Sequence, residues 1–146
     1  MGTRVVFEGG WYYTAVNALA TLATSEGTCS SATIAQGVDA HAAHLRRVLA
    51  LLGRAGIVEA REGRAGGYRL ARDPQDITLA EVFKAVQAAE PLEDAAASNC
   101  RRSCVFEVLD EIGLEAEREV LLVLERHSLA SLLARVARRR DGRHLP

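Results

Sequence analysis

Three segments near the beginning of the chain carry apolar residues at helical spacing. In residues 11–25 they stand at positions i, i+3, i+4 and i+7, namely Val16, Leu19, Ala20 and Ala23. This spacing predicts an amphipathic helix that ends before Gly27. Ser30 or Ser31 can cap a short second helix that reaches Val38, because a hydroxyl oxygen accepts from the free amides of a first turn. A third helix, capped at Asp39 and stopped by Gly56, has one apolar face formed by Leu45, Val48, Leu49 and Leu52.

The hydrophobic pattern changes from helical to strand-like after Gly56. Residues 57–61 and 68–70 predict two short strands, and the loop between them, residues 62–67, contains three glycines. Three helices followed by a two-stranded ribbon is the order of elements in a winged helix-turn-helix domain. We therefore expect a mainly α fold with a small β-hairpin as its wing.

The second half of the chain predicts three more helices. Thr78 and Glu81 have the spacing of a capping box at the start of a fourth helix, whose apolar residues are Leu79, Val82, Phe83 and Val86. Residues 90–99 are rich in alanine and acidic residues and are predicted to form a linker. A long helix then carries Val105, Leu109, Ile112, Ala116, Val120, Leu121 and Leu124. Ser128 can cap a last helix that contains Leu129, Leu132, Leu133 and Val136.

The apolar stripe of the long helix is too extensive for the small amino-terminal domain to bury. A second copy of the chain would cover it, and a symmetric dimer is the commonest arrangement of this kind. Packing of the stripe against its own chain is the alternative. The predicted organisation is a winged helix-turn-helix DNA-binding domain over residues 1–88, a linker with a cysteine pair over residues 89–104, and dimerisation helices with a basic tail over residues 105–146.

The composition is that of an ordinary globular protein. The 146 residues include 49% hydrophobic and 25% charged residues, with a formal net charge of −1, so wholesale disorder is excluded. This near-neutral total hides three blocks of charge. Residues 30–72 contain seven arginines and three acidic residues, residues 73–125 contain 13 acidic and four basic residues, and residues 126–146 contain six arginines and one aspartate. The net charge therefore does not argue against a nucleic-acid partner for the first block.

The cysteine count and the hydrophobic runs favour a cytoplasmic protein without a membrane partner. Three cysteines are too few for a secreted disulfide framework. The longest uncharged stretch, residues 9–25, is diluted by glycines, threonines and Asn17, and Glu8 interrupts the run that most resembles a leader. The sequence shows no convincing paired carboxylates, nucleophile with a base, phosphate loop or metal-ligand cluster, so we do not expect an enzyme.

One continuous part of the chain resembles a known family. The residues that carry the resemblance are 41–49, 55–58, the Gly-Gly-Tyr wing within 63–71, Asp73-Pro74 and 77–79. This pattern is similar to the Rrf2 family of bacterial winged helix-turn-helix transcription regulators, most closely between Ser30 and Val86. The resemblance implies a homodimer, expected to be a repressor, on a pseudo-palindromic double-stranded DNA operator. It places one recognition helix in each of two major grooves and the wings near the minor grooves.

The resemblance and the residue chemistry together give a set of expected DNA contacts. Arginines suit phosphates and guanine edges, hydroxyls at a helix start can donate to phosphates, and residues at the start of a recognition helix often contact bases. Glycines in a wing allow a close approach to a backbone. The expected contacts are Ser31, Thr33, His41, His44, Arg46, Arg47, Arg64, Gly66, Gly67 and Tyr68. Helix capping by the hydroxyls and plain solvation of the arginines are the alternatives. Trp11-Tyr12-Tyr13 stands near the place where family members often have a basic residue.

The cysteines depart from the family pattern. Many members hold an iron–sulfur cluster with three closely spaced cysteines, whereas this chain has only Cys100 and Cys104 in that region. We therefore expect no cofactor, although His127 or a carboxylate could in principle complete a cluster, and a zinc site meets the same shortage of ligands. The start of the long helix and two preceding arginines favour the reactive thiolate form, which predicts redox or electrophile sensing by this pair. On one regular helix an i, i+4 spacing would hold the two sulfurs too far apart for an unstrained disulfide.

Three hypotheses for the function follow. The first is a dimeric DNA-binding transcriptional regulator whose operator binding responds to thiol oxidation or electrophile modification at Cys100 and Cys104. The second is an iron–sulfur-cluster-sensing regulator of the same family. The third is a winged-helix module that binds a protein and no DNA. Cys29 fits best as a small buried residue.

Overall fold

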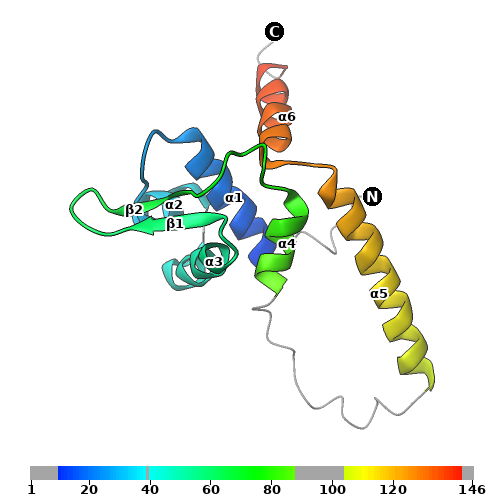
Figure 1. Ribbon diagram of the computed structural model, residues 1–146. Helices are drawn as coiled ribbons and strands as arrows, with labels where there is room; N and C mark the ends of the chain where they lie inside the picture. Colours follow the sequence, from blue (N-terminus) through cyan, green and yellow to red (C-terminus); the bar gives the residue numbers. More distant parts are fainter. Residues whose placement is uncertain (1–9, 39, 88–103, 143–146) are drawn as a thin grey trace.

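A computed structural model describes residues 10–38, 40–87 and 104–142, and these ranges contain six helices and one two-stranded antiparallel sheet (Figure 1). The predicted mainly α fold with a β-hairpin wing is confirmed. The elements are α1 (Trp11–Thr24), α2 (Ser31–Val38), α3 (Ala42–Arg54), β1 (Val58–Arg61), β2 (Gly67–Leu70), α4 (Leu79–Gln87), α5 (Cys104–Glu125) and α6 (Leu129–Asp141).

Helix α1 is the centre of the amino-terminal domain and packs against α2, α3, α4 and β2. Its buried residues are Thr14, Ala15, Ala18, Leu19 and Leu22. The buried face is therefore rotated away from the predicted stripe, of which only Leu19 is fully buried. The reason is that α1 is apolar around most of its circumference, so the spacing of its apolar residues does not single out one face.

The structure settles how α2 and α3 begin. The backbone amide of Thr33 donates to Ser30 Oγ at 3.1 Å, so Ser30 is the residue that caps α2. Helix α3 starts at Ala42 with His41 as its N-cap residue, and the His41 side chain makes no capping hydrogen bond. The expectation that Asp39 caps α3 and that His41 lies in its first turn is therefore wrong, and Asp39 itself is outside the described residues.

The apolar face and the end of α3 match the prediction. Leu45, Val48, Leu49 and Leu52 are all buried in the core. Gly56 has a φ of 68°, in the left-handed region that glycine adopts without steric cost. The helix thus buries one side completely and presents its other side to solvent.

The wing is fixed to the body of the domain by backbone hydrogen bonds. Strands β1 and β2 pair in register, with Glu59 opposite Arg69 and joined to it by an ion pair. The loop after α1 pairs with β2 through a single antiparallel bridge. Cys29 and Tyr68 each donate a backbone amide to the carbonyl of the other, at 2.9 and 2.8 Å. The wing therefore moves with α1 and α2 rather than as a free hairpin.

Helix α4 begins with the predicted capping box. The Glu81 amide donates to Thr78 Oγ1 at 3.1 Å, and the Thr78 amide donates to Glu81 Oε2 at 2.9 Å. Arg72 Nη2 donates to the other carboxylate oxygen of Glu81 at 3.0 Å. These bonds fix the turn that connects the wing to α4.

The start of α6 is attached to the start of α4. Ser128 Oγ accepts from the Ser131 amide at 3.1 Å, which confirms the predicted cap. The Leu79 amide donates to the His127 carbonyl at 2.9 Å, and the Leu129 amide donates to the Ile77 carbonyl at 2.8 Å. Leu129 is fully buried in the main core. The junction between α5 and α6 is consequently a rigid part of the winged domain.

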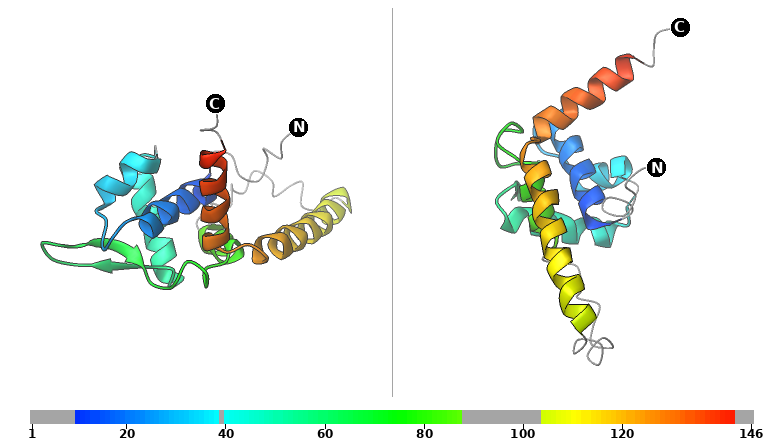
Figure 2. Two further views of the ribbon diagram at one scale, coloured as in Figure 1. Left: turned by 90° about the horizontal axis from the view of Figure 1, so that it is seen from above. Right: turned by 90° about the vertical axis from the view of Figure 1, so that its right-hand side faces the viewer.

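Helix α5 extends away from this junction (Figure 2). Its carboxyl-terminal residues Val120, Leu121 and Leu124 pack against α4, and Leu124 is the one buried residue of the helix. The predicted stripe residues Val105, Leu109 and Ile112 are 68%, 60% and 54% exposed. The predicted linker and Cys100 lie outside the described residues. None of the helices in the described ranges has the length and apolar character to cross a membrane.

We expect Glu81→Gln to remove a stabilisation that depends on pH. Burial by itself raises the pKa of the Glu81 carboxyl, but the Thr78 amide and the Arg72 guanidinium outweigh it and lower the pKa from the ordinary 4.5. The carboxylate therefore stabilises the fold above that pH, and the contribution is lost as the pH falls through the lowered value. Denaturant unfolding of the wild type and the variant should give different free energies at neutral pH and converging ones in acid. Glu62→Gln, at the exposed wing tip, is the control. If the unfolding free energies of the wild type and Glu81→Gln still differ in acid, this account of Glu81 is wrong.

Candidate nucleic-acid interface

The exposed side of α3 and the wing lie on one side of the molecule, away from α5 (Figures 1 and 2). Because α3 buries its apolar face in the core, its other face points outward with His41, Arg46, Arg47 and Ala50. The wing tip adds Arg64, which is also exposed. The fold thus brings the predicted arginines of the third helix and of the wing onto one side of the domain.

The arginines of this region fall into two groups. Arg69 is paired with Glu59, and Arg72 is paired with Glu81, so their charges are neutralised within the fold. Among the described residues, no carboxylate forms an ion pair with Arg46, Arg47 or Arg64. The second group therefore offers uncompensated guanidinium donors, which is the chemistry that phosphates and guanine edges require.

The two predicted histidines have different surroundings. His41 is exposed immediately before α3. His44 is half-buried, and its ring contacts the Trp11 ring with the centroids 4.5 Å apart. Trp11 also lines a hollow of about 220 Å³ together with Arg47 and Arg54. The start of α1 thus positions the beginning of α3, a role for Trp11 that the sequence pattern did not predict.

The predicted hydroxyl contacts lie at the start of α2. Ser31 is its first residue and is half-buried, whereas Thr33 is exposed. Thr33 Oγ1 lies 2.9 Å from Ser30 Oγ, so it takes part in the cap of its own helix. Thr28 Oγ1 donates to the Ala65 carbonyl at 2.9 Å, and this bond ties the segment before α2 to the wing tip beside Arg64.

The wing glycines make close approaches within the protein itself. A Cβ at Gly67 would lie 2.5 Å from the Cys29 carbonyl oxygen, and one at Gly66 would lie 2.6 Å from the Arg61 carbonyl oxygen. Tyr68 is half-buried, packs against the core and pairs with Cys29. Glycine is thus required at these positions by the fold, and contact of Gly66, Gly67 and Tyr68 with DNA stays a prediction.

The cysteines of the described ranges do not lie together. Cys29 is buried beneath the wing, and Cys104 is exposed at the first residue of α5, at the end of the helix that lies farthest from the body (Figure 1). No group of three or more His, Cys, Asp or Glu side chains in the described residues is placed to hold a metal ion. Cys29 is held in the core, and Cys100 lies outside the described residues, so whether the expected pair holds a cluster stays a prediction.

Three helices, a paired wing and an exposed face of α3 with unpaired arginines define a winged helix-turn-helix domain. The chain belongs to the Rrf2 family, because the family model, described as an iron-dependent transcriptional regulator, matches residues 12–135. The members that this family model describes are transcriptional regulators.

Known relatives and solved structures agree with this assignment. The chain is 40% identical over 78 residues to the HTH-type protein YwnA of Bacillus subtilis, over 53% of this chain and 57% of the relative. It is 33% identical over 93 residues to the HTH-type transcriptional regulator NsrR of the same organism, over 62% of this chain and 63% of the relative. These matches span less than two thirds of the relatives' lengths. The structure of T. potens IscR has a TM-score of 0.69 at 23% identity and covers 92% of this chain and 91% of that chain. This last likeness shows the shared fold.

We expect Gly67→Ala to destabilise the domain by about 1–3 kcal/mol, the usual cost of forcing an extra carbon into a packed site. The added Cβ would collide with backbone rather than with a side chain that can move. Thermal unfolding of the variant measures the loss. Gly53→Ala in α3 is the matched control, because its Cβ would meet the Val58 carbonyl oxygen at an ordinary 3.7 Å and alanine favours helix. Equal stabilities of the two variants would show that the wing does not depend on the approach of Gly67 to Cys29.

Proposed function

We propose that the chain acts as a homodimeric repressor that binds a double-stranded DNA operator through α3 and the wing, and that modification of Cys100 and Cys104 lowers its affinity for the operator. The observation that carries the DNA-binding part is the set of unpaired arginines on the exposed side of α3 and the wing. Bound at an operator, such a dimer would block transcription by occupying the site.

The geometry of α3 supports insertion into a major groove. The helix has 13 residues, buries one apolar face and leaves its amino-terminal end open to solvent. Residues at the amino-terminal end of a recognition helix usually contact base edges. His41 and His44 lie there, and Arg46 and Arg47 follow on the same exposed side. We assign base contacts to the histidines and phosphate or guanine contacts to the arginines.

The dimer is supported by the uncovered apolar surface of α5. Val105, Leu109 and Ile112 are more than half exposed, and a row of this length on one helix is rarely left in water. A two-fold dimer would cover the row with the same row, or with another surface, of a second copy. It would also place two α3 helices at a fixed separation, as a pseudo-palindromic operator requires.

The thiol response is supported by the position of Cys104. Its side chain is exposed and free, and it lies one residue before the apolar row of α5. Oxidation or alkylation there would add a polar or bulky group beside the surface that we assign to the dimer. A change in dimer geometry would alter the separation of the two recognition helices, which connects the modified thiol to the affinity for the operator.

We expect the double variant Arg46→Ala, Arg47→Ala to lose operator binding. Wild-type binding should weaken steeply with salt, because each neutralised phosphate releases counterions. Trp11 is the one tryptophan of the chain and contacts His44, so its fluorescence can follow titration with a duplex selected from genomic fragments by the wild-type protein. The control is Arg135→Ala, Arg138→Ala, which removes the same charge from α6. If the α3 double variant binds the duplex as the wild type does, the assignment of α3 as the recognition helix is wrong.

We expect the double variant Cys100→Ser, Cys104→Ser to keep its operator when treated with peroxide or a quinone, whereas the wild type releases it. Both proteins are titrated with the selected duplex before and after treatment, and the modified residues are mapped by mass spectrometry. Cys29→Ala, which leaves the pair intact, should respond like the wild type because Cys29 is buried. Release of DNA by the treated double variant would exclude these two thiols as the sensor.

An iron–sulfur regulator is the second candidate, and the observation that favours it is the description of the matching family model as iron-dependent. The visible absorption spectrum of protein purified without oxygen separates the two candidates. If the wild-type spectrum shows the absorption bands of a cluster and these bands are absent from the double cysteine variant, the protein is a cluster sensor and not a thiol sensor.

A further inference from the structure

A small hollow beside α3 contains two arginines among its lining residues and no acidic residue. Its volume is about 220 Å³, and it is lined by Trp11, Arg47, Ala50, Leu51 and Arg54. At about 30 Å³ for each water molecule, this volume corresponds to about seven waters. That is less space than a drug-sized ligand requires. The hollow therefore has the size and the charge to receive one small anionic group.

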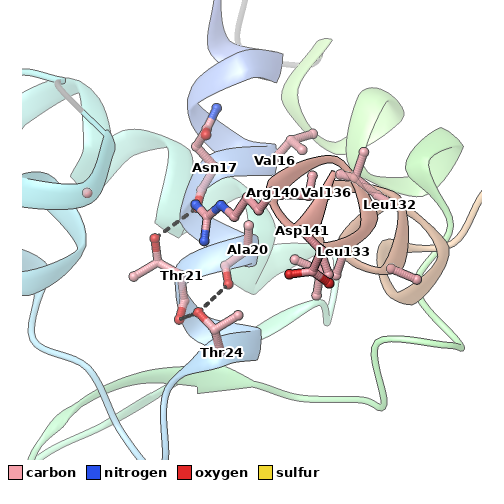
Figure 3. A pocket seen from close by; sticks show the side chains of 13 residues that line it. Val16, Asn17, Ala20, Thr21, Thr24, Leu132, Leu133, Val136, Arg140 and Asp141 are labelled. Atoms are coloured by element: carbon pink, nitrogen blue, oxygen red, sulfur yellow. Dashed lines mark hydrogen bonds between the residues drawn. The ribbon is translucent and has the colours of Figure 1, made fainter. Parts of the chain in front are cut away.

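The larger cleft between α1 and α6 has a different character (Figure 3). It measures about 790 Å³, and its rim carries Asp141 as well as Arg140. A hydroxyl of its α1 wall is already used within the helix, because Thr21 Oγ1 donates to the Asn17 carbonyl at 3.0 Å. Of these two hollows, the one beside α3 is thus the one suited to an anion.

The two arginines of the hollow lie in one row along α3. Residues at intervals of three, four and three stand on the same side of a helix. The row consists of His44, Arg47, Leu51 and Arg54. His44 and Leu51 are half-buried, and the His44 ring contacts the Trp11 ring. The row therefore follows the edge of the exposed face of α3 that lies beside the start of α1.

The positive charge at the hollow is not compensated within the described part of the chain. Arg47 and Arg54 are exposed, and neither side chain forms an ion pair with a described carboxylate. Helix α1 begins at Trp11, and the amino-terminal end of a helix carries a partial positive charge. Gly10, its N-cap residue, has no side chain that accepts from the first-turn amides, and the first turn contains no acidic residue. Two independent sources of positive potential thus meet at the hollow.

The place of the row on α3 indicates which anion the hollow receives. The major groove of DNA is about 12 Å wide, and an α-helix with its side chains is about as wide. The edges of an inserted helix therefore approach the two phosphate backbones, whereas its centre faces the bases. The Arg47–Arg54 row is such an edge. A backbone phosphate is the anion that the proposed docking of α3 brings to it.

We infer that the hollow between Trp11 and α3 receives one phosphate of the DNA backbone, bound by the guanidinium groups of Arg47 and Arg54. The inference rests on the proposed DNA binding and adds Arg54 to its contacts. The two arginines are separated by about 10 Å along the helix axis, at about 1.5 Å per residue, so their long side chains approach the phosphate from two sides. The Trp11 ring excludes water from one wall, which strengthens the attraction between the charges. Arg46 does not line the hollow and remains available for a base edge.

The salt dependence of DNA binding tests this contact. Arg54→Gln removes the charge and keeps a side chain that donates hydrogen bonds. We expect it to reduce the slope of log affinity against log salt by about 0.9 for each bound copy, because one phosphate contact no longer releases counterions. Affinity for the selected duplex and for an unrelated duplex should fall by the same factor, on the order of tenfold. Fluorescence anisotropy of a labelled duplex measures both quantities.

Two control variants separate this role from a structural one. Arg54→Lys keeps the charge and should keep the wild-type salt slope. Arg135→Gln makes the same change at an exposed position of α6 and should also leave the slope unchanged. Arg54 lies in the last turn of α3, where a basic residue stabilises the helix. If Arg54→Gln lowers only the unfolding temperature and keeps the wild-type salt slope, the inference is overturned.

Neutral phosphates in the DNA locate the contact. Each duplex of a series carries one methylphosphonate, which removes the charge of one backbone phosphate of the selected sequence. We expect one position for each bound copy at which this substitution weakens binding by the wild type and not by Arg54→Gln, because both changes remove the same contact. If every position affects the two proteins equally, no backbone phosphate occupies the hollow.

Titration with sodium phosphate, without DNA, distinguishes a backbone phosphate from a free one. Trp11 is the one tryptophan of the chain and lines the hollow, so its fluorescence reports an anion bound there. We expect phosphate to act no differently from sodium chloride at equal ionic strength. A saturable change with phosphate alone would overturn the assignment to the DNA backbone.

The outcomes also separate this inference from the proposed function. If the double variant Arg46→Ala, Arg47→Ala loses the duplex but Arg54→Gln keeps the wild-type salt slope, the phosphate contact at the hollow is wrong and the DNA-binding function stands. If the double variant binds the duplex as the wild type does, the proposed recognition by α3 fails, and the inference fails with it.

Discussion

The structure depends on α1 being apolar around most of its circumference. A helix of this kind must be covered on several sides, and α2, α3, α4 and β2 cover only part of it. Burial of Ala15, Ala18 and Leu19 creates the core that supports α3. The remaining side, with Val16 and Ala20, faces α6 across an open cleft. One helix thus supports both the exposed face of α3 that we propose for DNA and one wall of the cleft beside α6.

The fold pairs some arginines of the wing region with carboxylates and leaves others unpaired. The carboxylates of this region are few, and two of them are used by Arg69 and Arg72 inside the structure. Surface ion pairs contribute little stability, so the main effect of this pairing is on which charges stay free. Arg46, Arg47 and Arg64 keep their full positive charge toward solvent, on the side where a phosphate backbone is expected. The Cys29–Tyr68 bridge fixes the wing to the segment between α1 and α2, and both of these helices pack against α3, so these charges keep a fixed geometry.

Much of this fold could be predicted because its signals are local. The α3 face, the Thr78–Glu81 capping box and the Ser128 cap depend on residues within four positions of one another. Contacts between residues that are far apart in the sequence could not be predicted. The contact of Trp11 with His44 and the approach of Gly67 to Cys29 join segments that only the tertiary structure brings together. The local spacing of α1 left its buried face undetermined, because alanines occur on several sides of the helix. The sequence identified the arginines of the candidate site, but it did not show which of them form ion pairs within the fold.

The three charge blocks of the sequence correspond to three surfaces with separate tasks in the proposed dimer. The acidic block lies mainly on α5, which projects away from the wing and α3. A helix with this charge is repelled by phosphates, so it keeps the DNA on the side of the molecule that carries the free arginines. The near-neutral total charge is thus the sum of blocks of opposite sign, and the positive charge that the proposed DNA contact uses lies at α3 and the wing.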